Sequence, residues 1–438
     1  MTTVLVVGGG GREHTLCWSL GKSSRVDRIL VAPGNAGTAL AERCENLEVG
    51  AGDLAGLVDA ARRESVDLVA VGPEAPLAAG LADAMEAIGV PTFGPSADCA
   101  RLEASKAYCK TFLNELSVPT AASATFREPE PALAYLDQLP SVPVIKASGL
   151  AAGKGVVVAE TPAEAAAAIR AMLVDGRFGE AGREVVVEER LRGTEISVLA
   201  FSDGNDFVVM PAAQDHKRIF DGDRGPNTGG MGAFVPSPFA TGGLIGEVSN
   251  RIIRPTLDAL AAAGTPYRGV IYFGLMLTEE GPRVLEINCR LGDPETQAVL
   301  PLLESDLFEV MLGCATGSLG GVQVEWSGSA CTTVVMSSAG YPTVSAKPAP
   351  ISGLKEAVIE GCLVFHAGTS LVDGVIHATG GRVLGVTALG NTLPEATERA
   401  YAGVEAITFE GSHHRLDIGR RPLPESVRVP LSHGGSIR

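Results

Sequence analysis

Paired cysteines, basic charge and long apolar runs are scarce in this sequence of 438 residues. Its eight cysteines form no CxxC pair and show no zinc-like spacing, so we expect buried, reduced thiols rather than disulfides or a zinc site. Lys and Arg number 35 against 51 Asp and Glu, which gives a formal net charge of −16 and argues against nucleic acid as a partner. An anionic substrate would therefore need a local basic or amide-lined site.

Signals for export or membrane insertion are also missing. The longest uncharged stretch, Trp326 to Ala346, is interrupted by Ser, Thr, Gly and Pro, and no basic region precedes the short apolar run at the N-terminus. We therefore expect a cytoplasmic protein with no membrane partner. Aromatic residues make up only 5% of the chain whereas glycine occurs 54 times, a balance typical of short turns and close helix–sheet packing.

Strands alternate with helices over the first hundred residues, which predicts a parallel α/β sheet. Strands are expected at 4–7, 29–31, 46–49, 66–71 and 91–93, and helices at 12–20, 54–63 and 76–88. A helix at 105–116 leads out of this unit, and a strand–turn–strand–helix–strand block follows at 142–188. In that block Thr161-Pro162-Ala163-Glu164 is typical of a capping box that opens a helix.

The strands lengthen after residue 195, which predicts a mostly antiparallel sheet with helices on one side. They are expected at 196–201, 207–210, 269–277 and 283–288, with a helix near 244–263. A last block holds strands at 332–336, 364–367 and 383–388, a helix at 393–406 and a frayed end at 431–438. The expected domains are a Rossmann-like domain at 1–104, a lid subdomain with its leading helix at 105–192, a central domain at 193–325 and a C-terminal domain at 326–430.

A run of glycines, Gly8-Gly9-Gly10-Gly11-Arg12-Glu13-His14, lies between the first expected strand and helix. Free backbone N–H groups at a helix start bind anions, and the missing Cβ atoms let a phosphate approach. A dinucleotide-binding dehydrogenase is the obvious alternative, but Pro33-Gly34-Asn35 stands where its ribose-binding acid would end the second strand. The run therefore predicts a phosphate or sugar site, with a purely structural turn as the other interpretation.

A second glycine-rich loop joins two expected strands within 145–156. It is not a Walker A loop, because no Ser or Thr follows Lys154 and no helix follows the loop. Such a loop can close over a triphosphate as a flap, and Lys146, fixed by a strand end, is the candidate phosphate ligand. After the strand that ends near Glu188, backbone would face adenine and a carboxylate would accept the ribose hydroxyls. The alternatives are a hairpin with solvated lysines and a solvated acidic strand end.

Alternation along the expected strand at 283–288 places Glu286 and Asn288 on one face. A carboxylate and an amide oxygen make an oxygen-only site that suits Mg²⁺, which keeps waters and shares phosphate oxygens. Arg290 is in phase with both and would contact a transferring phosphoryl group. The alternative is an edge strand whose polar side chains face water.

Together these segments resemble the ATP-grasp ligases, and within them the phosphoribosylamine–glycine ligases, from Val4 to about Arg420. The matching strings are GGGGREH at 8–14, APGNAGT at 32–38, VGPEAPL at 71–77, LEASKAYCK at 102–110, SGLAAGKGV at 148–156, QDHKR at 214–218, GPNTGGMGA at 225–233, EINCRLGDPETQ at 286–297 and HAGT at 366–369. The strings GPNTGGMG and NCRLGDPET are far more specific than a single glycine motif. The resemblance implies an α/β fold with α+β elements: an N-terminal parallel α/β domain, ATP-grasp lid and central domains, and a small C-terminal α+β domain.

The resemblance also implies an activity, the ATP-dependent ligation of glycine to 5-phosphoribosylamine through glycyl phosphate in purine synthesis. ATP would be held by Lys106, Lys146, Glu188, Glu189, Arg190, Leu191 and Glu195, and Mg²⁺ or Mn²⁺ by Glu286 and Asn288. Phosphoribosylamine would contact Gly10, Gly11, Arg12, Glu13, Asn35, Glu74 and Lys217, and the reaction centre would hold Asp215, Arg290 and Asp293. Glycine and phosphoribosylamine are thus the expected partners, and the oligomeric state is left open, a monomer included.

Two positions depart from the family's pattern. Ser148 stands where the family commonly has an acid, and Thr343 follows Tyr341-Pro342 where a glycine is usual. The first departure concerns the lid loop and the second a C-terminal loop. Two other functions stay open: a ligase for another acid and amine, against which GPNTGGMG argues, and a non-catalytic nucleotide-binding module, against which Lys146, Glu286 and Arg290 argue.

Overall fold

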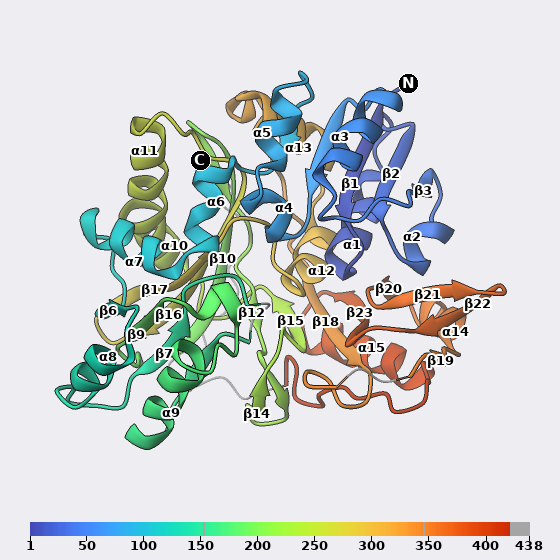
Figure 1. The fold of residues 1–438 in the computed structure, drawn as a ribbon. Coiled ribbons are helices and arrows are strands. Elements are labelled where there is room, and N and C mark those ends of the chain that lie inside the picture. Colours follow the sequence, from blue (N-terminus) through green and yellow to red (C-terminus); the bar gives the residue numbers. More distant parts are fainter. Residues whose placement is uncertain (152–153, 345–346, 421–438) are drawn as a thin grey trace.

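The computed structural model describes residues 1–151, 154–344 and 347–420 (Figure 1). The predicted frayed end at 431–438 lies outside these residues, as do positions 152–153 of the lid loop and 345–346 of the loop after Tyr341. Figure 1 shows the N-terminal domain in blue above the C-terminal domain in orange and red, with the lid in teal and green at the other side of the molecule.

The N-terminal domain holds a parallel sheet, as predicted, and the structure shows its strands in the order β3-β2-β1-β4-β5. Its strands are β1 (Thr3–Gly8), β2 (Arg28–Pro33), β3 (Cys44–Asn46), β4 (Leu68–Val71) and β5 (Thr92–Phe93), and its helices are α1 (Gly11–Leu20), α2 (Ala36–Leu40), α3 (Leu54–Arg63), α4 (Glu74–Ala78), α5 (Leu81–Glu86) and α6 (Ala97–Ala104). The single helix predicted at 76–88 is wrong, because Gly80 adopts a left-handed φ of 89° that separates α4 from α5. The loops after β1 and β2 lie at the carboxyl edge of the sheet, where such folds bind ligands.

The lid follows helix α7 (Lys106–Glu115) and holds an antiparallel sheet in the order β6-β9-β7-β8. Its strands are β6 (Ser123–Phe126), β7 (Val144–Ala147), β8 (Val156–Val158) and β9 (Val185–Glu188), and its helices are α8 (Pro129–Leu136) and α9 (Pro162–Leu173). The predicted strand–turn–strand–helix–strand order is confirmed, and Thr161 caps α9 by accepting the Glu164 N–H at 3.2 Å. Strand β6 and helix α8 were not predicted from the sequence.

The central domain contains the antiparallel sheet β11-β10-β16-β17, in which β17 is an edge strand. The strands are β10 (Thr194–Asp203), β11 (Phe207–Val209), β16 (Arg268–Thr278) and β17 (Gly281–Asn288). The helix predicted at 244–263 exists as α10 (Gly242–Val248) and α11 (Arg254–Ala262), joined by a π-helical turn at Ser249–Ile253. Helices α12 (Glu295–Val299) and α13 (Leu307–Thr316) follow β17, and residues of α13 share a buried core with α1 and β10.

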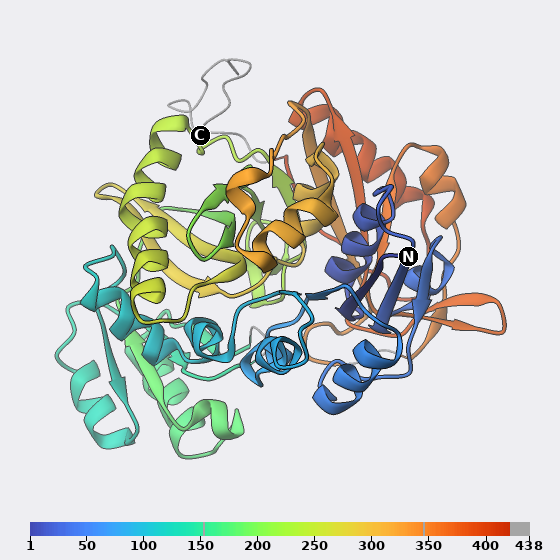
Figure 2. The ribbon, with the colours of Figure 1, turned by 90° about the horizontal axis from the view of Figure 1, so that it is seen from above.

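A second large sheet, in the order β12-β15-β18-β23-β20, crosses the expected boundary between residues 325 and 326. In the sequence, strands β12 (Gln214–Asp215) and β15 (Gly232–Val235) precede this boundary. Strands β18 (Ala330–Ser337), β20 (Leu363–His366) and β23 (Arg382–Gly390) follow it. The remaining elements are the hairpin β13 (Arg218–Phe220) and β14 (Arg224–Asn227), the small sheet of β19 (Ala349–Pro350), β21 (Thr369–Val372) and β22 (Val375–Ala378), and helices α14 (Leu354–Ile359) and α15 (Leu393–Ala406). In Figure 2 the β21–β22 hairpin projects from the C-terminal domain.

Candidate functional site

A cavity of about 2400 Å³ opens where the N-terminal domain, lid, central domain and C-terminal domain meet. Most of the predicted site residues line it, namely Arg12, Glu74, Lys106, Lys146, Glu188, Glu189, Arg190, Leu191, Glu195, Asp215, Lys217, Glu286, Asn288, Arg290 and Asp293. Of the other predicted residues, Gly10 and Asn35 lie in the adjoining loops after β1 and β2, and Gly11 and Glu13 lie in the first turn of α1. These predicted residues come from the N-terminal domain, the lid with its leading helix and the central domain, and the C-terminal domain adds Tyr341 and Arg382 to the lining.

Strand β17 presents its polar face to this cavity, as the alternation predicts. The Asn288 amide donates to Glu286 Oε1 at 3.5 Å, and the Arg290 guanidinium donates to Asn288 Oδ1 at 3.3 Å. Lys217, with help from Lys146 and Lys106, lowers the pKa of Glu286 to about 2 against the effect of burial. The carboxylate is therefore ionised at neutral pH, and with the Asn288 oxygen it offers the hard oxygen ligands that suit Mg²⁺.

Lys110 of helix α7 and Lys146 of the lid meet at the buried carboxylate of Glu188. Lys146 Nζ lies 2.9 Å from Glu188 Oε2 and donates to the Leu285 carbonyl at 3.0 Å, while Lys110 Nζ lies 3.1 Å from the same Glu188 oxygen. Lys106 Nζ donates to the Gly149 carbonyl at 3.3 Å. Sequence reasoning missed Lys110, although its spacing of four residues from Lys106 on one predicted helix was a usable signal.

Ser148 connects the lid loop to the start of α7. Its hydroxyl accepts the Ala107 N–H at 3.2 Å, and its carbonyl accepts the Lys106 N–H at 2.8 Å. Ser105 completes the contact, because its hydroxyl lies 3.3 Å from that of Ser148 and caps α7 by accepting the Tyr108 N–H. Ser148 is thus a buried hydrogen-bonding residue at the joint between lid and helix.

Arg290 is held by two carboxylates from the N-terminal part of the chain. Its guanidinium lies 2.7 Å from Glu103 and 3.3 Å from Glu74. Burial works to raise the pKa of Glu74, but Arg290 and Arg12 hold it below its ordinary value. Sequence reasoning missed Glu103, which also accepts the Cys289 N–H at 2.6 Å and so fixes the end of β17.

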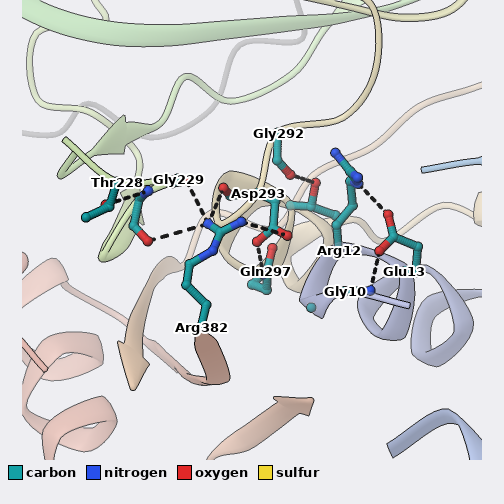
Figure 3. A network of polar contacts seen from close by, with 12 residues as sticks. Gly10, Arg12, Glu13, Thr228, Gly229, Gly292, Asp293, Gln297 and Arg382 are labelled. Atoms are coloured by element: carbon teal, nitrogen blue, oxygen red, sulfur yellow. Dashed lines mark hydrogen bonds and ion pairs between the residues drawn. The ribbon is translucent and has the colours of Figure 1, made fainter. Parts of the chain in front are cut away.

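Asp293 lies at the centre of the polar network in Figure 3. Arg382 of β23 reaches its carboxylate at 3.2 Å, and Gln297 donates to it at 2.7 Å. Burial opposes ionisation, yet Arg382 and Arg12 lower the pKa of Asp293. No motif pointed to Arg382, which follows Asp293 by 89 residues.

Asp215 differs from Asp293 in its electrostatic environment. Burial, and next the nearby Glu295, raise the pKa of Asp215 well above its ordinary value. Within the described residues its Oδ1 is buried and has no hydrogen-bond partner. A substrate ammonium group would supply both the missing donor and the missing positive charge.

Glu13 and Asn35 hold the loops of the N-terminal domain in shape. Glu13 accepts the Gly10 N–H and the Arg12 Nε–H, each at 2.6 Å. Asn35 caps α2 by accepting the Gly37 N–H at 2.8 Å, and its amide donates to the His366 carbonyl of the HAGT string at 2.8 Å. These contacts explain both residues structurally, and their contact with substrate stays a prediction.

Comparison with known proteins decides the family. The family description "Phosphoribosylglycinamide synthetase, N domain" matches residues 2–103, the "ATP-grasp (A) domain" matches 104–296 and the "C domain" matches 331–421. The chain belongs to the phosphoribosylglycinamide synthetase family. It is therefore a ligase with an ATP-grasp fold, and the dehydrogenase alternative is excluded.

Curated relatives agree with this assignment. The chain is 48% identical to phosphoribosylamine–glycine ligase of Vibrio vulnificus strain CMCP6 over 96% of this chain and 98% of that protein, and 48% identical to that of Synechocystis over 96% and 100%. It is 49% identical to the trifunctional purine biosynthetic protein adenosine-3 of Gallus gallus over 96% of this chain. The chain spans only 42% of the length of that trifunctional relative.

Solved structures show the same similarity. The crystal structure of phosphoribosylamine–glycine ligase from Thermotoga maritima matches with a TM-score of 0.82 and 32% identity, and covers 95% of this chain and 100% of that one. A biotin carboxylase from Campylobacter jejuni shares the fold at a TM-score of 0.68 and 12% identity, with 94% and 93% covered. Across the described part of the chain, the helices of this family member are too short or too polar to cross a membrane.

Proposed function

We propose that this chain ligates glycine to 5-phosphoribosylamine with ATP, giving glycinamide ribonucleotide, ADP and phosphate in purine synthesis in the cytoplasm. The observation that carries the proposal is that Glu286 and Asn288 of β17, with Arg290 just after the strand, line the same cavity as the lysines at 106 and 146. Relatives that match nearly their whole length to this chain are named phosphoribosylamine–glycine ligase. That name supplies the two substrates.

ATP is assigned to the side of the cavity formed by α7 and the lid. Lys106 and Lys146 would contact the phosphates, and the segment Glu189–Leu191, which lines the cavity, would lie along the adenine. The Glu188 carboxylate is 1% exposed and ion-paired with Lys110 and Lys146. We therefore assign it to positioning these two lysines rather than to binding ribose. The half-exposed Glu195 is the carboxylate available for the ribose hydroxyls.

A divalent cation is assigned to Glu286 and Asn288. The donor set fits Mg²⁺, and also Mn²⁺, because one carboxylate and one amide oxygen leave positions for water and phosphate oxygens. A bound Mg²⁺ would neutralise charge on the phosphates during transfer. Arg290, which Glu74 and Glu103 orient, would add a fixed positive charge on the same side of the transferring group.

The reaction proceeds in two steps in this proposal. A carboxylate oxygen of glycine attacks the γ-phosphorus of ATP, the bond to ADP breaks, and glycyl phosphate forms. The amine of phosphoribosylamine then attacks the acyl carbon, phosphate leaves, and the amine nitrogen loses a proton. Asp215 would bind the ammonium group of glycine, and Asp293 would face the incoming amine. Because glycyl phosphate hydrolyses readily, the closed lid would exclude water.

One assay tests the proposal. ADP release should require glycine and phosphoribosylamine together, and glycinamide ribonucleotide should form in equal amount. ADP release with a different acid or amine, and none with this pair, would identify another ATP-grasp ligase. Nucleotide binding without any ADP release would identify a non-catalytic module.

A further inference from the structure

Arg382 stands at the first position of β23 in the C-terminal domain and holds two segments of the central part of the chain (Figure 3). One guanidinium nitrogen donates to the Gly229 carbonyl and to the Asp293 carbonyl, both at 2.6 Å. The other nitrogen lies 3.2 Å from the Asp293 carboxylate. A single side chain therefore ties the GPNTGG loop to the turn that begins α12.

The same loop is packed so closely that side chains are excluded from it. A Cβ on Gly229 would lie 2.9 Å from the Arg382 guanidinium carbon, and a Cβ on Gly230 would lie 2.3 Å from Pro294 and 2.8 Å from Asp215. The Tyr341 hydroxyl accepts the Gly229 N–H at 3.0 Å. Two side chains of the C-terminal domain thus hold this loop, one at its carbonyl and one at its N–H.

Asp293 lies between this contact and the glycine run of the N-terminal domain. Its Oδ2, which Arg382 contacts, is 3.3 Å from the position that a Cβ on Gly10 would take. Its Oδ1 accepts the Gln297 amide. The carboxylate lines the cavity, so a phosphoribosylamine held by the glycine run would meet Asp293 on its way to the reaction centre.

We propose that Arg382 is a positioning residue for the amine half of the reaction: it fixes Asp293 and the Thr228–Gly230 loop against the glycine run of the N-terminal domain. This inference rests on the proposed function. Of the lysines assigned to ATP, Lys146 is oriented by Glu188 of the lid. Lys106 donates to the Gly149 carbonyl of the lid loop, and within the described part of the chain neither lysine contacts Arg382. Loss of Arg382 should therefore impair the use of phosphoribosylamine and glycine and leave ATP binding intact.

Because charged groups surround Asp293, the pH dependence of kcat/KM tests the proposal. The cations that act on it are Arg382 of β23, Arg12 of α1 and Arg290 after β17, and the carboxylates of Asp215 and Glu295 act on Arg382. Arg382 is the first of the cations that lower the pKa of Asp293. Removing it should raise that pKa and move the acid limb of kcat/KM for phosphoribosylamine to higher pH.

The test compares Arg382→Gln and Arg382→Lys with Arg399→Gln. Arg399 is half-exposed on α15 in the same domain and pairs with Glu395, so it serves as the matched control. In Arg382→Gln, kcat/KM for phosphoribosylamine should fall on the order of 10²-fold, the effect of a small displacement near the reacting atoms, with the KM for ATP unchanged. Arg382→Lys keeps the charge but not the two-pronged geometry, so its acid limb should stay near that of the wild type while its rate falls.

Two results would overturn the proposal. The first is an Arg382→Gln variant that keeps the wild-type kcat/KM for phosphoribosylamine and for glycine, and whose acid limb of kcat/KM lies at the same pH as in the wild type. The second is a variant in which the KM for ATP rises and the melting temperature falls together with the loss of kcat/KM for phosphoribosylamine and glycine. That result would make Arg382 a general structural residue. The wild-type assay separates this outcome from failure of the proposed function, because that function fails only if the wild type does not need phosphoribosylamine.

Discussion

Lys146 and Glu188 lie 2.9 Å apart on the neighbouring lid strands β7 and β9, and both side chains are buried. Lys110 approaches the same carboxylate at 3.1 Å, so two buried ammonium groups share one negative charge. The cluster therefore carries one positive charge in excess, at a place where the cavity would receive a triphosphate. A buried charge that lacks a partner is costly, and phosphate oxygens would supply the missing negative charge.

The first prediction concerns this cluster. Glu188→Ala should lower the free energy of unfolding by roughly 3–5 kcal/mol, because it leaves two buried lysines without a carboxylate. Glu189→Ala is the matched control, since Glu189 is half-exposed and 3.4 Å from Arg283, and it should cost less than about 1 kcal/mol. Urea unfolding measures both, and equal losses in the two variants would contradict the burial argument.

The second prediction concerns the cation site. Glu286→Gln should reduce Mg²⁺-dependent turnover by roughly 10²-fold, because it removes the one ionised ligand of the pair. The control is Glu280→Gln, an exposed residue in the turn between β16 and β17 that pairs with Arg283. Turnover is measured across a Mg²⁺ titration. Near-wild-type rates of Glu286→Gln at saturating Mg²⁺ would remove the assignment.

The third prediction concerns the lid, about Thr125 to Arg192. Its described loop residues 146–151 and 154–156 should exchange amide hydrogens faster without ATP than with it, because the loop would gain contacts only when it closes over the phosphates. Hydrogen exchange with and without ATP measures this, and strand β1 serves as the internal control. Equal protection of the loop in both states would argue against a flap.

The fourth prediction concerns two buried histidines between the N- and C-terminal domains. The backbone N–H of His366 donates to His14 Nδ1 at 2.8 Å. Burial lowers the pKa of His14 to about 3 and that of His366 to about 4. Both rings are neutral in the folded state but take up protons in the unfolded state below about pH 6.5. Stability should therefore be complete above that pH and fall as the pH drops toward 4.

Thermal unfolding between pH 7.5 and pH 4.5 checks this dependence. A double variant, His14→Asn with His366→Gln, should show a flatter change of melting temperature with pH than the wild type. The asparagine can keep an acceptor near the position of Nδ1, so the His14→Asn change preserves the contact to the residue 366 N–H. Identical slopes in wild type and double variant would show that other groups control the acid limb.

The fifth prediction concerns the intermediate. Glycine labelled with ¹⁸O in its carboxylate should deliver label to the released phosphate during turnover with phosphoribosylamine, because a carboxylate oxygen becomes the bridge of glycyl phosphate. Mass spectrometry of the phosphate measures the transfer. If product forms and the phosphate carries no label, the phosphoryl group never reached glycine, and ATP cleavage would drive the reaction in another way.

Local patterns predicted those parts of the fold and site that depend on neighbours in sequence. Alternation placed Glu286 and Asn288 on one face of β17, and the capping signal placed Thr161 at the start of α9, both as the structure has them. The alternative of an edge strand was half right, because β17 is at a sheet edge but its polar face lines the cavity. Periodicity and capping are properties of a few consecutive residues, so one sequence reveals them.

Contacts between distant segments could not be predicted in this way. Arg382 binds a turn 89 residues earlier, and Glu103 contacts Arg290 187 residues later, and neither lies in a repeating pattern. Gly80 was missed for a different reason: the apolar pattern at 76–88 continues through it, while its positive φ interrupts the helix between α4 and α5. Such residues are determined by tertiary packing, which overrides local preference.

The sheet that crosses residue 325 limits how this chain can be divided. Strand β15 pairs with β18 from Gly232–Val334 to Val235–Cys331, so the ATP-grasp part relies on the C-terminal part to cover one of its strands. A protein truncated after residue 325 would expose the N–H and C=O groups of β15 as a template for pairing with another chain. Aggregation, rather than a small active fragment, is the expected product of such a truncation, whereas two fragments expressed together could restore the sheet by complementation.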